Sequence, residues 1–570
     1  MICDFPILNG TWIRLGCLSG LLLMCFTSAL AGPENPSSGS KGMVVSVSRE
    51  ASQVGLDILA AGGNAVDSAV AVGFALSVTY PEAGNLGGGG FAVVRLPSGE
   101  VVTLDHREQA PLASWPTQFL DESGQYDPRK ALYSHLASGT PGSVDGLLRL
   151  HRRFGKLTRE EVLAPAIELA ESGFEISDIL ASRLRDLVAG VPERPATVAK
   201  FSLPSRPLEG GDLWRQPDLA KTLRAISKAG AAGFYSGWVA EAIVAEMKRG
   251  GGLITQADLK DYVSVWRKPV HGRYRGYDIY GMGPPSSGGI LLIQMLNMLQ
   301  DFELETLPLG SAALIHLMTE VERRAYADRA EHLGDPDFWQ VPQQALIDRQ
   351  YAAARMAGFD PERASSSRDV GHGLADPESE QTTHFSVIDD AGMMVALTTT
   401  LNSSFGSQWV VPGTGILLNN EMDDFAASSD SANQYGLVGN AANAIEPRKR
   451  MLSSMSPTIV LKSGQPYLIT GSPGGSTIIT TVLQVIVNMI DFGLDLEAAV
   501  RRPRIHHQWQ PDVIYFGPEA IDPPTQNALR ALGHQLKERP AMGDANSISI
   551  EGDVFTGFAD PREGGAALGY

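Results

Sequence analysis

The chain has 570 residues, which is long enough for a large core in one big domain or several ordinary ones. Its composition, 43% hydrophobic and 19% charged, is that of a folded soluble protein. The net charge of −18 argues against a nucleic acid or an anionic membrane surface as partner.

The N-terminal segment has the pattern of a secretory signal. Arg14 precedes the apolar run LGCLSGLLLMCFTSALA, whose last three residues, 29–31, form a small-x-small triplet. We therefore predict a signal peptide over residues 1–31 and a secreted product, periplasmic or extracellular. The alternatives are a retained membrane anchor, for which the apolar run is short, and a lipid anchor on Cys17 or Cys25, where the preceding residues fit a lipobox poorly.

All the cysteines lie inside this predicted signal, at positions 3, 17 and 25. The mature chain would therefore contain none. Disulfides, cysteine nucleophiles and cysteine-ligated metals are then excluded together.

The first part of the mature chain predicts a strand, two helices and a second strand. MVVSVS begins the strand at residue 43, and apolar helical spacing predicts the helices up to residue 80, the second from Asn64. The glycine run NLGGGGF (85–91) then precedes a strand over 91–96. It could cradle a phosphate, but it precedes a strand and lacks Lys-Ser/Thr, so a crowded buried turn is favoured.

The middle of the chain, 140–350, is predicted to be mostly helical, with breaks at GLIT and PPSSGGI. From residue 382 onward, short strands alternate with glycine turns, and one long helix is predicted near 477–493. A helical half and a strand-rich half indicate one interleaved α/β body, with a soft seam at 365–381.

Two predicted strands on either side of the turn sequence DDAG form a hairpin, over residues 383–388 and 393–400. If Ile388 pairs with Met393, Thr382 faces Thr399, and a shift of one residue sets it beside Thr400. Threonines therefore gather at the open end of the hairpin. The pattern alone favours plain β-forming residues on a sheet face, and a functional site is the alternative.

A threonine hydroxyl becomes a nucleophile only when a base activates it. The sequence has no G-x-S-x-G elbow and no H-E-x-x-H zinc helix. His506 and His507 are adjacent and fit core or surface positions better than metal ligands. One remaining option is a threonine made N-terminal by chain cleavage, whose α-amine, with a pKa of about 8, can accept the proton. The soft seam before Thr382 is where such a cut would be accessible.

From about Gly42 to the C-terminus, the sequence resembles the γ-glutamyltranspeptidases, self-cleaving members of the N-terminal-nucleophile hydrolases. The resemblance rests on AGNLGGGGF (83–91), LDHRE (104–108), GTPGS (139–143), PPSSGG (284–289), YADR (326–329), TTHFSV (382–387), TLNSSFG (400–406), LLNNEMDDF (417–425), MLSSMSPT (451–458) and GSPGGS (471–476). It implies a four-layer α/β/β/α sandwich. It also implies a large subunit, 32–381, and a small subunit, 382–570, that stay associated after cleavage.

The resemblance implies the catalytic roles. Thr382 becomes the nucleophile, both for cutting the Gln381–Thr382 bond and for attacking a γ-glutamyl carbonyl. Thr400 would hydrogen-bond the Thr382 hydroxyl. Gly474 and Gly475 would give backbone N–H groups to the oxyanion, a task that suits glycine because a side chain would block close approach.

Two further sets of residues resemble those with which the family binds the α-carboxylate and the α-ammonium of the glutamyl group. The carboxylate clamp is implied at Arg107, Ser453 and Ser454. The ammonium site is implied at Asn402, Glu421 and Asp424, and a lid residue at Tyr435. An arginine suits the clamp because its planar fork matches a carboxylate.

The sequence departs from the family pattern at three places. His106 stands where an apolar or aromatic residue is common, and Met451 where proline is usual. Glu421 matches the animal enzymes, whereas many bacterial ones have glutamine. These departures affect the expected substrate tuning and leave the expected chemistry unchanged.

The implied activity is that of a γ-glutamyltransferase and hydrolase without metal or organic cofactor. Glutathione is the expected donor, and water, an amino acid or a peptide amine the expected acceptor. The alternatives within the fold are a β-lactam side-chain acylase and a poly-γ-glutamate-handling relative, against which Arg107, Asp424 and the lid argue. A non-catalytic γ-glutamyl-peptide-binding protein is the alternative of another class, and Thr382 with Thr400 and the glycine pair argues against it.

Overall fold

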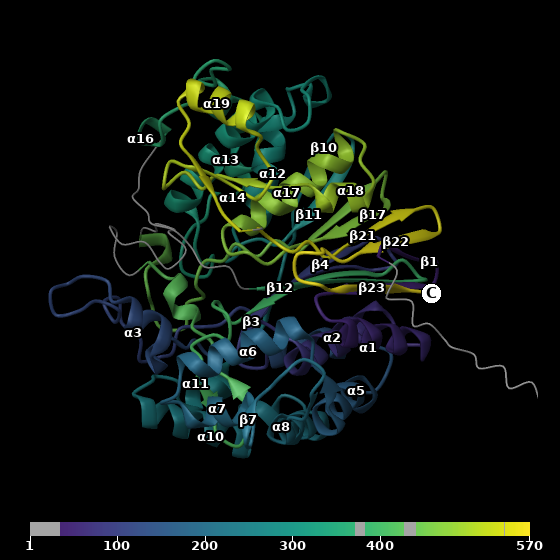
Figure 1. Cartoon of the computed structure of the whole chain (residues 1–570), viewed down its shortest axis with the longest axis vertical. Helices are drawn as coiled ribbons and strands as arrows, with labels where there is room; N and C mark the ends of the chain where they lie inside the picture. Colours follow the sequence, from purple (N-terminus) through teal and green to yellow (C-terminus); the bar gives the residue numbers. More distant parts are fainter. Residues whose placement is uncertain (1–34, 371–381, 427–440, 541) are drawn as a thin grey trace, which may run out of the picture.

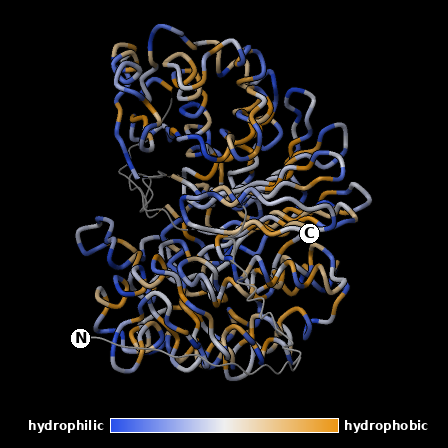
Figure 2. Tube along the Cα trace, turned by 45° about the vertical axis from the view of Figure 1, so that its right-hand side comes forward, coloured by the Kyte–Doolittle hydropathy of each residue, from blue (hydrophilic) through white to orange (hydrophobic). Residues whose placement is uncertain are grey.

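The protein is built from two stacked β-sheets, each covered by helices on its outer face (Figure 1). The computed structural model describes residues 35–370, 382–426, 441–540 and 542–570. Apolar residues run through the sheets and both helical layers, and hydrophilic residues gather in the outer loops (Figure 2). The predicted α/β/β/α sandwich is confirmed.

The first sheet carries the predicted hairpin and has the antiparallel order β23-β2-β12-β13-β3-β4-β9. Its strands are β23 (Ala566–Gly569), β2 (Gly42–Ser46), β12 (Thr383–Asp389), β13 (Met394–Thr400), β3 (Gly89–Arg95), β4 (Val101–Asp105) and β9 (Val265–Arg267). Strands from before and after residue 382 are neighbours in this sheet. The two parts of the chain are therefore interleaved in one body.

The second sheet has the antiparallel order β1-β22-β21-β17-β16-β11-β10. Its strands are β1 (Ser37–Gly39), β22 (Val554–Phe558), β21 (Ser547–Glu551), β17 (Gln465–Thr470), β16 (Thr458–Lys462), β11 (Tyr277–Gly281) and β10 (Val270–Tyr274). An apolar core that includes Val45, Phe91, Ile459 and Ile469 fills the space between the sheets. The strands in the middle of the first sheet, such as β12, β13 and β3, are therefore buried throughout, whereas β10 and β22 of the second sheet carry exposed residues.

The helical layer on the first sheet is formed mainly by α1 (Arg49–Ala60), α2 (Ala65–Thr79), α4 (Ser143–Phe154), α5 (Arg159–Ser172), α6 (Asp178–Gly190), α8 (Pro217–Ala229) and α10 (Gly237–Gly250). Helix α2 contacts β12 and β13 and is buried on every side, so its sequence is apolar all round. The Asn64 side chain caps it together with Asp67, at the predicted start.

The opposite helical layer is formed mainly by α12 (Gly288–Leu299), α13 (Ala312–His332), α17 (Thr477–Ile490), α18 (Leu496–Arg501) and α19 (Pro523–Leu532). The shorter elements are α3 (Pro128–Tyr133), α7 (Pro195–Lys200), α9 (Ala232–Tyr235), α11 (Gln256–Asp261), α14 (Gln343–Leu346), α15 (Arg349–Met356), α16 (Ser367–Val370), β5 (Phe174–Glu175), β6 (Ser202–Leu203), β7 (Arg206–Pro207), β8 (Leu213–Trp214), β14 (Val410–Val411), β15 (Ile416–Leu417), β18 (Ile505–His506), β19 (Ile514–Phe516) and β20 (Leu536–Glu538). The long helix predicted near 477–493 is α17.

The register of the hairpin differs by one residue from the predicted pairing. Ile388 pairs with Met394, and Met393 belongs to the turn. The turn takes up the extra residue because the Asp389 carboxylate accepts hydrogen bonds from the backbone N–H groups of Ala391 and Met393. The prediction that Ile388 faces Met393 was therefore wrong by one position.

The observed register determines which threonines face each other at the open end of the hairpin. Thr383 pairs with Thr399, so one further step sets Thr382 opposite Thr400. Even-numbered β13 residues such as Met394 point into the core between the sheets, and odd-numbered ones point to the helices. Thr400 consequently lies on the inter-sheet side, whereas the Thr399 hydroxyl donates to the Gly89 carbonyl on the other side.

The glycine run before β3 is a crowded turn, as predicted. A Cβ atom on Gly87 would lie 2.0 Å from the Leu417 carbonyl oxygen, and one on Gly88 would lie 2.0 Å from that of Thr400. Only hydrogen fits at these positions. The backbone of the run therefore packs against the end of β13 and against Leu417 of β15.

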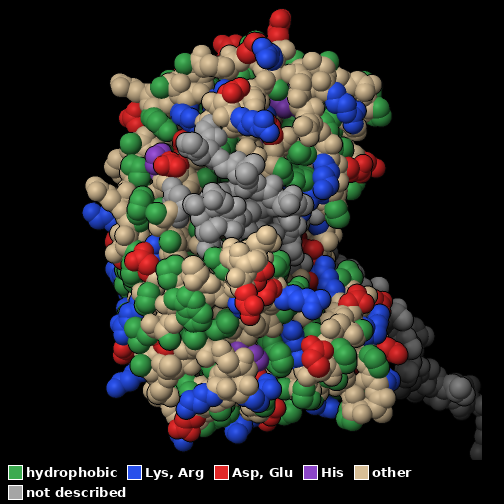
Figure 3. Space-filling model, turned by 90° about the vertical axis from the view of Figure 1, so that its left-hand side faces the viewer, with side chains coloured by type: hydrophobic (Ala, Val, Ile, Leu, Met, Phe, Trp, Pro, Cys, Tyr) green, Lys and Arg blue, Asp and Glu red, His purple; other side chains and the backbone are tan. Residues whose placement is uncertain are grey.

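Several predicted features lie outside the described residues: the signal peptide over 1–31, Gln381 of the cleavage site, and Tyr435. Within the described ranges, no helix is both long enough and apolar enough to cross a membrane. Figure 3 shows one face of the molecule, where acidic and basic side chains are interspersed, so on this face the charge is not gathered in one patch.

Candidate active site

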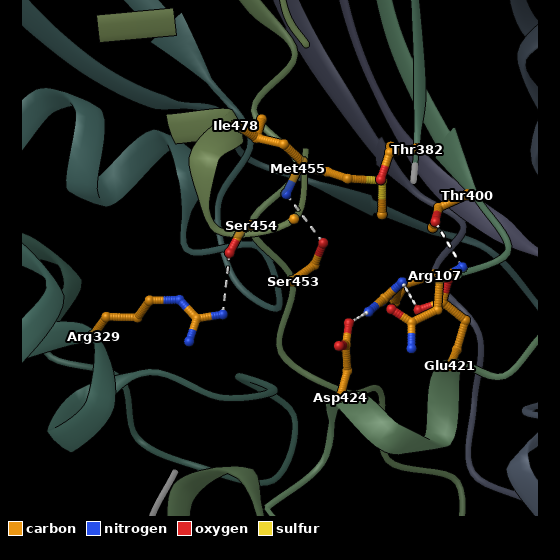
Figure 4. Close-up of a pocket in the computed structure, with 12 residues that line it drawn as sticks. Arg107, Arg329, Thr382, Thr400, Glu421, Asp424, Ser453, Ser454, Met455 and Ile478 are labelled. Carbon is orange, nitrogen blue, oxygen red and sulfur yellow. Dashed lines mark hydrogen bonds and ion pairs between the residues drawn. The ribbon is translucent and has the colours of Figure 1, made fainter. Parts of the chain in front are cut away.

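A polar pocket lies at the open end of the β12–β13 hairpin (Figure 4). It is lined by Arg107, Arg329, Thr382, Thr400, Asn402, Glu421, Asp424, Ser453, Ser454, Met455, Gly475 and Ile478. These residues come from strands, loops and helices of both parts of the chain. The structure thus brings together most of the residues that the sequence resemblance predicted for the site.

The two hairpin threonines lie on the same side of this pocket (Figure 4). Both are buried, Thr382 at 6% exposure and Thr400 at 3%. The Thr400 hydroxyl oxygen accepts the backbone N–H of Asn402 at 2.8 Å. A threonine hydroxyl that accepts one hydrogen bond can also donate one. This arrangement fits the predicted role of Thr400 as a donor to a neighbouring hydroxyl.

Arg107 is the central charge of the pocket. It follows the end of β4, and its side chain is 1% exposed. Its Nη1 lies 2.5 Å from Glu421 Oε2, and its Nη2 lies 2.5 Å from Asp424 Oδ2. The cation and the anions predicted to bind a zwitterionic amino-acid end are therefore in direct contact. A ligand carboxylate could replace the carboxylates as partner of Arg107, and a ligand ammonium could replace Arg107 as partner of Glu421 and Asp424.

The buried carboxylates of Glu108 and Glu421 and the part-buried carboxylate of Asp424 surround the Arg107 guanidinium. Glu108, which the sequence analysis did not single out, lies 3.5 Å from Arg107. Burial raises the pKa of Glu108 to about 7 against the opposing effect of Arg107, and burial likewise raises the pKa values of Glu421 and Asp424. In the described part of the chain, one oxygen each of Glu108 and Glu421 has no hydrogen-bond partner. An ammonium group would supply the missing positive charge and donors.

Asn402 occupies the first turn after β13 with a left-handed φ of 76°. Asparagine adopts this conformation more readily than most residues. Its side-chain N–H donates to the Asn420 carbonyl oxygen at 2.9 Å. This bond fixes which way the amide points and turns its oxygen away from Asn420.

Ser453 and Ser454 are held by the PPSSGG loop that precedes α12. The Ser287 N–H donates to the Ser453 carbonyl at 2.8 Å, and the Ser453 N–H donates to the Pro285 carbonyl at 2.9 Å. The Met455 N–H donates to the Ser453 hydroxyl oxygen at 3.1 Å. Two loops more than 150 residues apart in sequence thus fix the predicted carboxylate clamp.

The glycine pair of GSPGGS forms the turn into α17. Gly474 and Gly475 have φ values of 128° and 53°, which favour glycine. Gly475 lines the pocket, whereas Gly474 is not among the lining residues and lies against Thr477 and Gly543. The positive end of the α17 dipole is here, where it favours a developing negative charge. The predicted oxyanion role of the pair stays a prediction.

Two of the residues that depart from the family pattern, His106 and Met451, are buried and packed as core residues. His106 is 1% exposed, neither of its ring nitrogens has a partner within the described residues, and burial lowers its pKa to about 4. Its neutral ring therefore fills an apolar position. Met451 is fully buried in a small core with Phe119 and Phe425.

The histidines of the described residues give no metal centre at the pocket. His506 and His507 are buried and hydrogen-bonded, as core residues. Over the described ranges, one group has ligand atoms close enough for a metal ion: His316, Glu320 and His534. The two imidazoles hydrogen-bond each other at 2.7 Å, and Glu320 pairs with arginines. None of the three residues lines the pocket.

The pocket also contains residues that the sequence analysis missed. They are Arg329, Met455 and Ile478, with Glu108 just behind Arg107. The motifs LDHRE, YADR and MLSSMSPT contained three of them. Nothing in these motifs told a pocket residue from a core residue, because burial and partners distant in sequence decide the difference.

A four-layer sandwich with a threonine directly before a central strand is the arrangement of the N-terminal-nucleophile hydrolases. The family model for Gamma-glutamyltranspeptidase matches residues 51–570. The chain therefore belongs to the γ-glutamyltranspeptidase family.

Known proteins that are similar to this chain agree with this assignment. The chain is 47% identical to the glutathione hydrolase proenzyme of Escherichia coli (strain K12), over 97% of this chain and 98% of that protein. It is 42% identical to the glutathione hydrolase proenzyme of Pseudomonas sp. (strain A14), over 95% and 96%. The crystal structure of cephalosporin acylase from Bacillus halodurans superposes with a TM-score of 0.83 at 27% identity, over 96% of this chain and 99% of that chain.

Proposed function

We propose that this protein is a self-processing γ-glutamyltransferase and hydrolase that acts on glutathione and related γ-glutamyl compounds. The observation that carries the proposal is the contact of Arg107 with Glu421 and Asp424 in the pocket that Thr382 lines. This pattern matches a γ-glutamyl donor, whose α-carboxylate and α-ammonium lie on one carbon while its reactive carbonyl lies three carbons away.

Maturation is the first step of the proposed mechanism. The Thr382 hydroxyl attacks the carbonyl carbon of Gln381, the peptide bond shifts to an ester, and water hydrolyses the ester. The products are a large subunit, 32–381, and a small subunit, 382–570. Their strands are neighbours in the first sheet, so the cut subunits would stay associated.

Catalysis then uses the new N-terminus. The free α-amine of Thr382 takes the hydroxyl proton as the oxygen attacks the γ-glutamyl carbonyl, and it returns the proton to the departing amine. Thr400 donates to the nucleophile, and backbone N–H groups of Gly474 and Gly475 stabilise the oxyanion. Water or an amine acceptor then releases the glutamyl group from Thr382.

Binding of the donor exchanges partners inside the pocket. Its α-carboxylate pairs with Arg107 and accepts hydrogen bonds from the hydroxyls of Ser453 and Ser454. Its α-ammonium pairs with the carboxylates of Glu421 and Asp424. The Asn402 amide oxygen is the further acceptor, and Tyr435 is proposed to cover the pocket. No metal or organic cofactor enters any of these steps.

The cellular location follows from the N-terminal pattern. We infer that residues 1–31 direct secretion and are removed, which gives a periplasmic or extracellular enzyme. There its partners would be small molecules: γ-glutamyl compounds as donors, and amino acids or peptides as acceptors.

One alternative has a specific observation in its favour. The fold similarity to a cephalosporin acylase, over 96% of this chain, makes β-lactam side-chain acylation the second candidate. The Arg107–Asp424 pair and the proposed lid oppose it, as they oppose a polymeric poly-γ-glutamate donor, because both donors need a more open site. A non-catalytic γ-glutamyl-peptide-binding protein would need no nucleophile.

Two linked measurements test the proposal. Mass spectrometry of the purified protein should give two chains, the smaller beginning Thr-Thr-His-Phe. Hydrolysis of a γ-glutamyl anilide should be measurable and should be faster with glycylglycine as acceptor. A single chain without anilide hydrolysis would favour the binding protein, and preferential release of a β-lactam side chain would favour the acylase.

A further inference from the structure

Helix α13 supports the pocket from the side opposite Arg107 through its YADR motif. Tyr326 and Arg329 are three residues apart and therefore share a helix face. The Tyr326 hydroxyl donates to the Ser476 carbonyl at the start of α17. Arg329 reaches the pocket itself, and Figure 4 shows its guanidinium beside Ser454.

The contacts of Arg329 fix the direction of one hydroxyl. Its Nη2 donates to Ser454 Oγ at 3.3 Å. A guanidinium can only donate, so the Ser454 oxygen accepts, and the proton of its hydroxyl points elsewhere. In the part of the chain that the structure describes, that proton has no acceptor. The Ser454 hydroxyl is thus prepared to donate to an anion in the pocket.

The same guanidinium acts on Ser453 through a neighbour. Arg329 Nε donates to Ser287 Oγ at 3.0 Å, which leaves the Ser287 proton for the Ser453 carbonyl at 2.8 Å. The Ser453 backbone is held by this bond, and its hydroxyl oxygen accepts the Met455 N–H at 3.1 Å. The Ser453 proton is then also available to an anion.

Arg329 contributes charge as well as hydrogen bonds. It is 4% exposed, and it opposes the rise that burial causes in the pKa of Asp424, in the same sense as Arg107 does. A second buried cation beside two hydroxyls makes this side of the pocket more favourable for a carboxylate.

We propose that Arg329 is a positioning residue that sets the Ser453 and Ser454 hydroxyls as donors to the α-carboxylate of the substrate, without touching the substrate itself. The inference rests on the proposed function, because it needs a donor with an α-carboxylate. It assigns to the YADR arginine a role in recognition, in addition to its place in the core of α13.

The test compares two donors that differ only in the α-carboxylate. They are a γ-glutamyl anilide and the 4-aminobutyryl anilide, which lacks that group. For the first donor, Arg329→Gln should raise KM about ten- to a hundredfold with kcat changed much less, the range for a hydrogen-bond array to a charged group. For the second, kcat/KM should stay within about threefold of wild type. Arg329→Lys should recover only part of the loss, because an ammonium lacks the planar fork that bonds both Ser287 and Ser454.

Two further variants separate positioning from folding. Ser454→Ala and Arg329→Gln should be less than additive in the double variant, because both remove the same donor to the carboxylate. Arg324→Gln is the matched control, since Arg324 lies on the same helix, pairs with Glu320 at 2.5 Å and does not line the pocket. It should lower the thermal unfolding temperature without changing KM for either donor.

The possible outcomes are distinct. Equal losses on the two anilides, or strict additivity with Ser454→Ala, would overturn the role of Arg329 while leaving the proposed function standing. A wild-type enzyme that prefers the donor without the carboxylate would instead overturn the proposed function. If Arg329→Gln fails to fold, Arg329→Lys supports the same comparison of donors.

Discussion

The two sides of the pocket are held by different kinds of structure. Thr382 and Thr400 lie at the ends of adjacent strands, in a sheet with both faces buried. Arg107 lies in the loop after β4, its partners lie in the short 3-10 helix Glu421–Asp424, and ion pairs join the two segments. A strand holds a hydroxyl with little room to move, whereas ion pairs can exchange partners. The hairpin therefore suits a reaction, and the charged side suits binding and release.

This difference predicts which functions separate on mutation. Self-cleavage takes place within the chain and needs only the hairpin side. Turnover of a γ-glutamyl donor needs both sides. Substitutions on the hairpin should affect both processes, and substitutions on the charged side should affect turnover alone.

The largest effect is expected at Thr382. Thr382→Ala removes the nucleophile, so the chain should remain uncut and inactive, as seen by denaturing gel and by anilide hydrolysis. Thr382→Ser keeps a hydroxyl and should still be cut. Full activity in an uncut Thr382→Ala chain would refute the mechanism.

A loss of several kcal/mol in transition-state binding is expected at Arg107. Arg107→Ala leaves the buried Glu421 and the part-buried Asp424 without their cation and removes the partner of the substrate carboxylate. The transition-state stabilisation derived from kcat/KM should therefore fall by about 3–5 kcal/mol. Arg107→Lys should recover only part. Self-cleavage should stay complete by mass spectrometry. Wild-type activity in Arg107→Ala would remove this residue from the site.

A ten- to thousandfold loss is expected at Thr400. Thr400→Ala removes one positioned hydrogen bond, so self-cleavage and turnover should both slow by roughly that range, with near-normal folding. Thr400→Ser should restore most of both rates. Thr399→Ala is the control, because its hydroxyl faces Gly89 on the other side of the sheet. A silent Thr400→Ala with a crippling Thr399→Ala would contradict the structure's register.

The smallest effect is a shift in pH dependence. Burial raises the pKa of Glu108 to about 7, so donor binding should weaken as the pH falls through this range and Glu108 takes up a proton. The charge of Glu108 also raises the pKa of Glu421. Glu108→Gln should therefore move the acid limb of 1/KM to lower pH, measured with a γ-glutamyl anilide. An unchanged limb, or one moved to higher pH, would contradict this coupling.

Local patterns in the sequence predicted the hairpin but not its register. Alternation and the DDAG turn indicated two paired strands with threonines at their open end. The pairing was one residue off, because the Asp389 side chain closes the turn through Ala391 and Met393. A side chain that accepts bonds from its own turn leaves no mark in a hydrophobic pattern.

The charged side could be predicted only through the family resemblance. Arg107 and Asp424 are 317 residues apart in the chain, so no local spacing connects them. Arg329 was missed for the same reason, since its partner Ser454 is 125 residues away. The pKa of Glu108 depends on burial, which the five letters of LDHRE do not contain. Contacts between distant segments set this half of the pocket.

The most direct test of the account is to trap the glutamyl group on the enzyme. Purified protein is mixed with a γ-glutamyl anilide, quenched in acid and digested, and the peptides are analysed by mass spectrometry. We predict a small subunit whose N-terminal peptide, beginning at Thr382, gains the mass of one glutamyl group. A glutamyl group on any other peptide, or turnover by a chain that is still uncut before Thr382, would contradict the account.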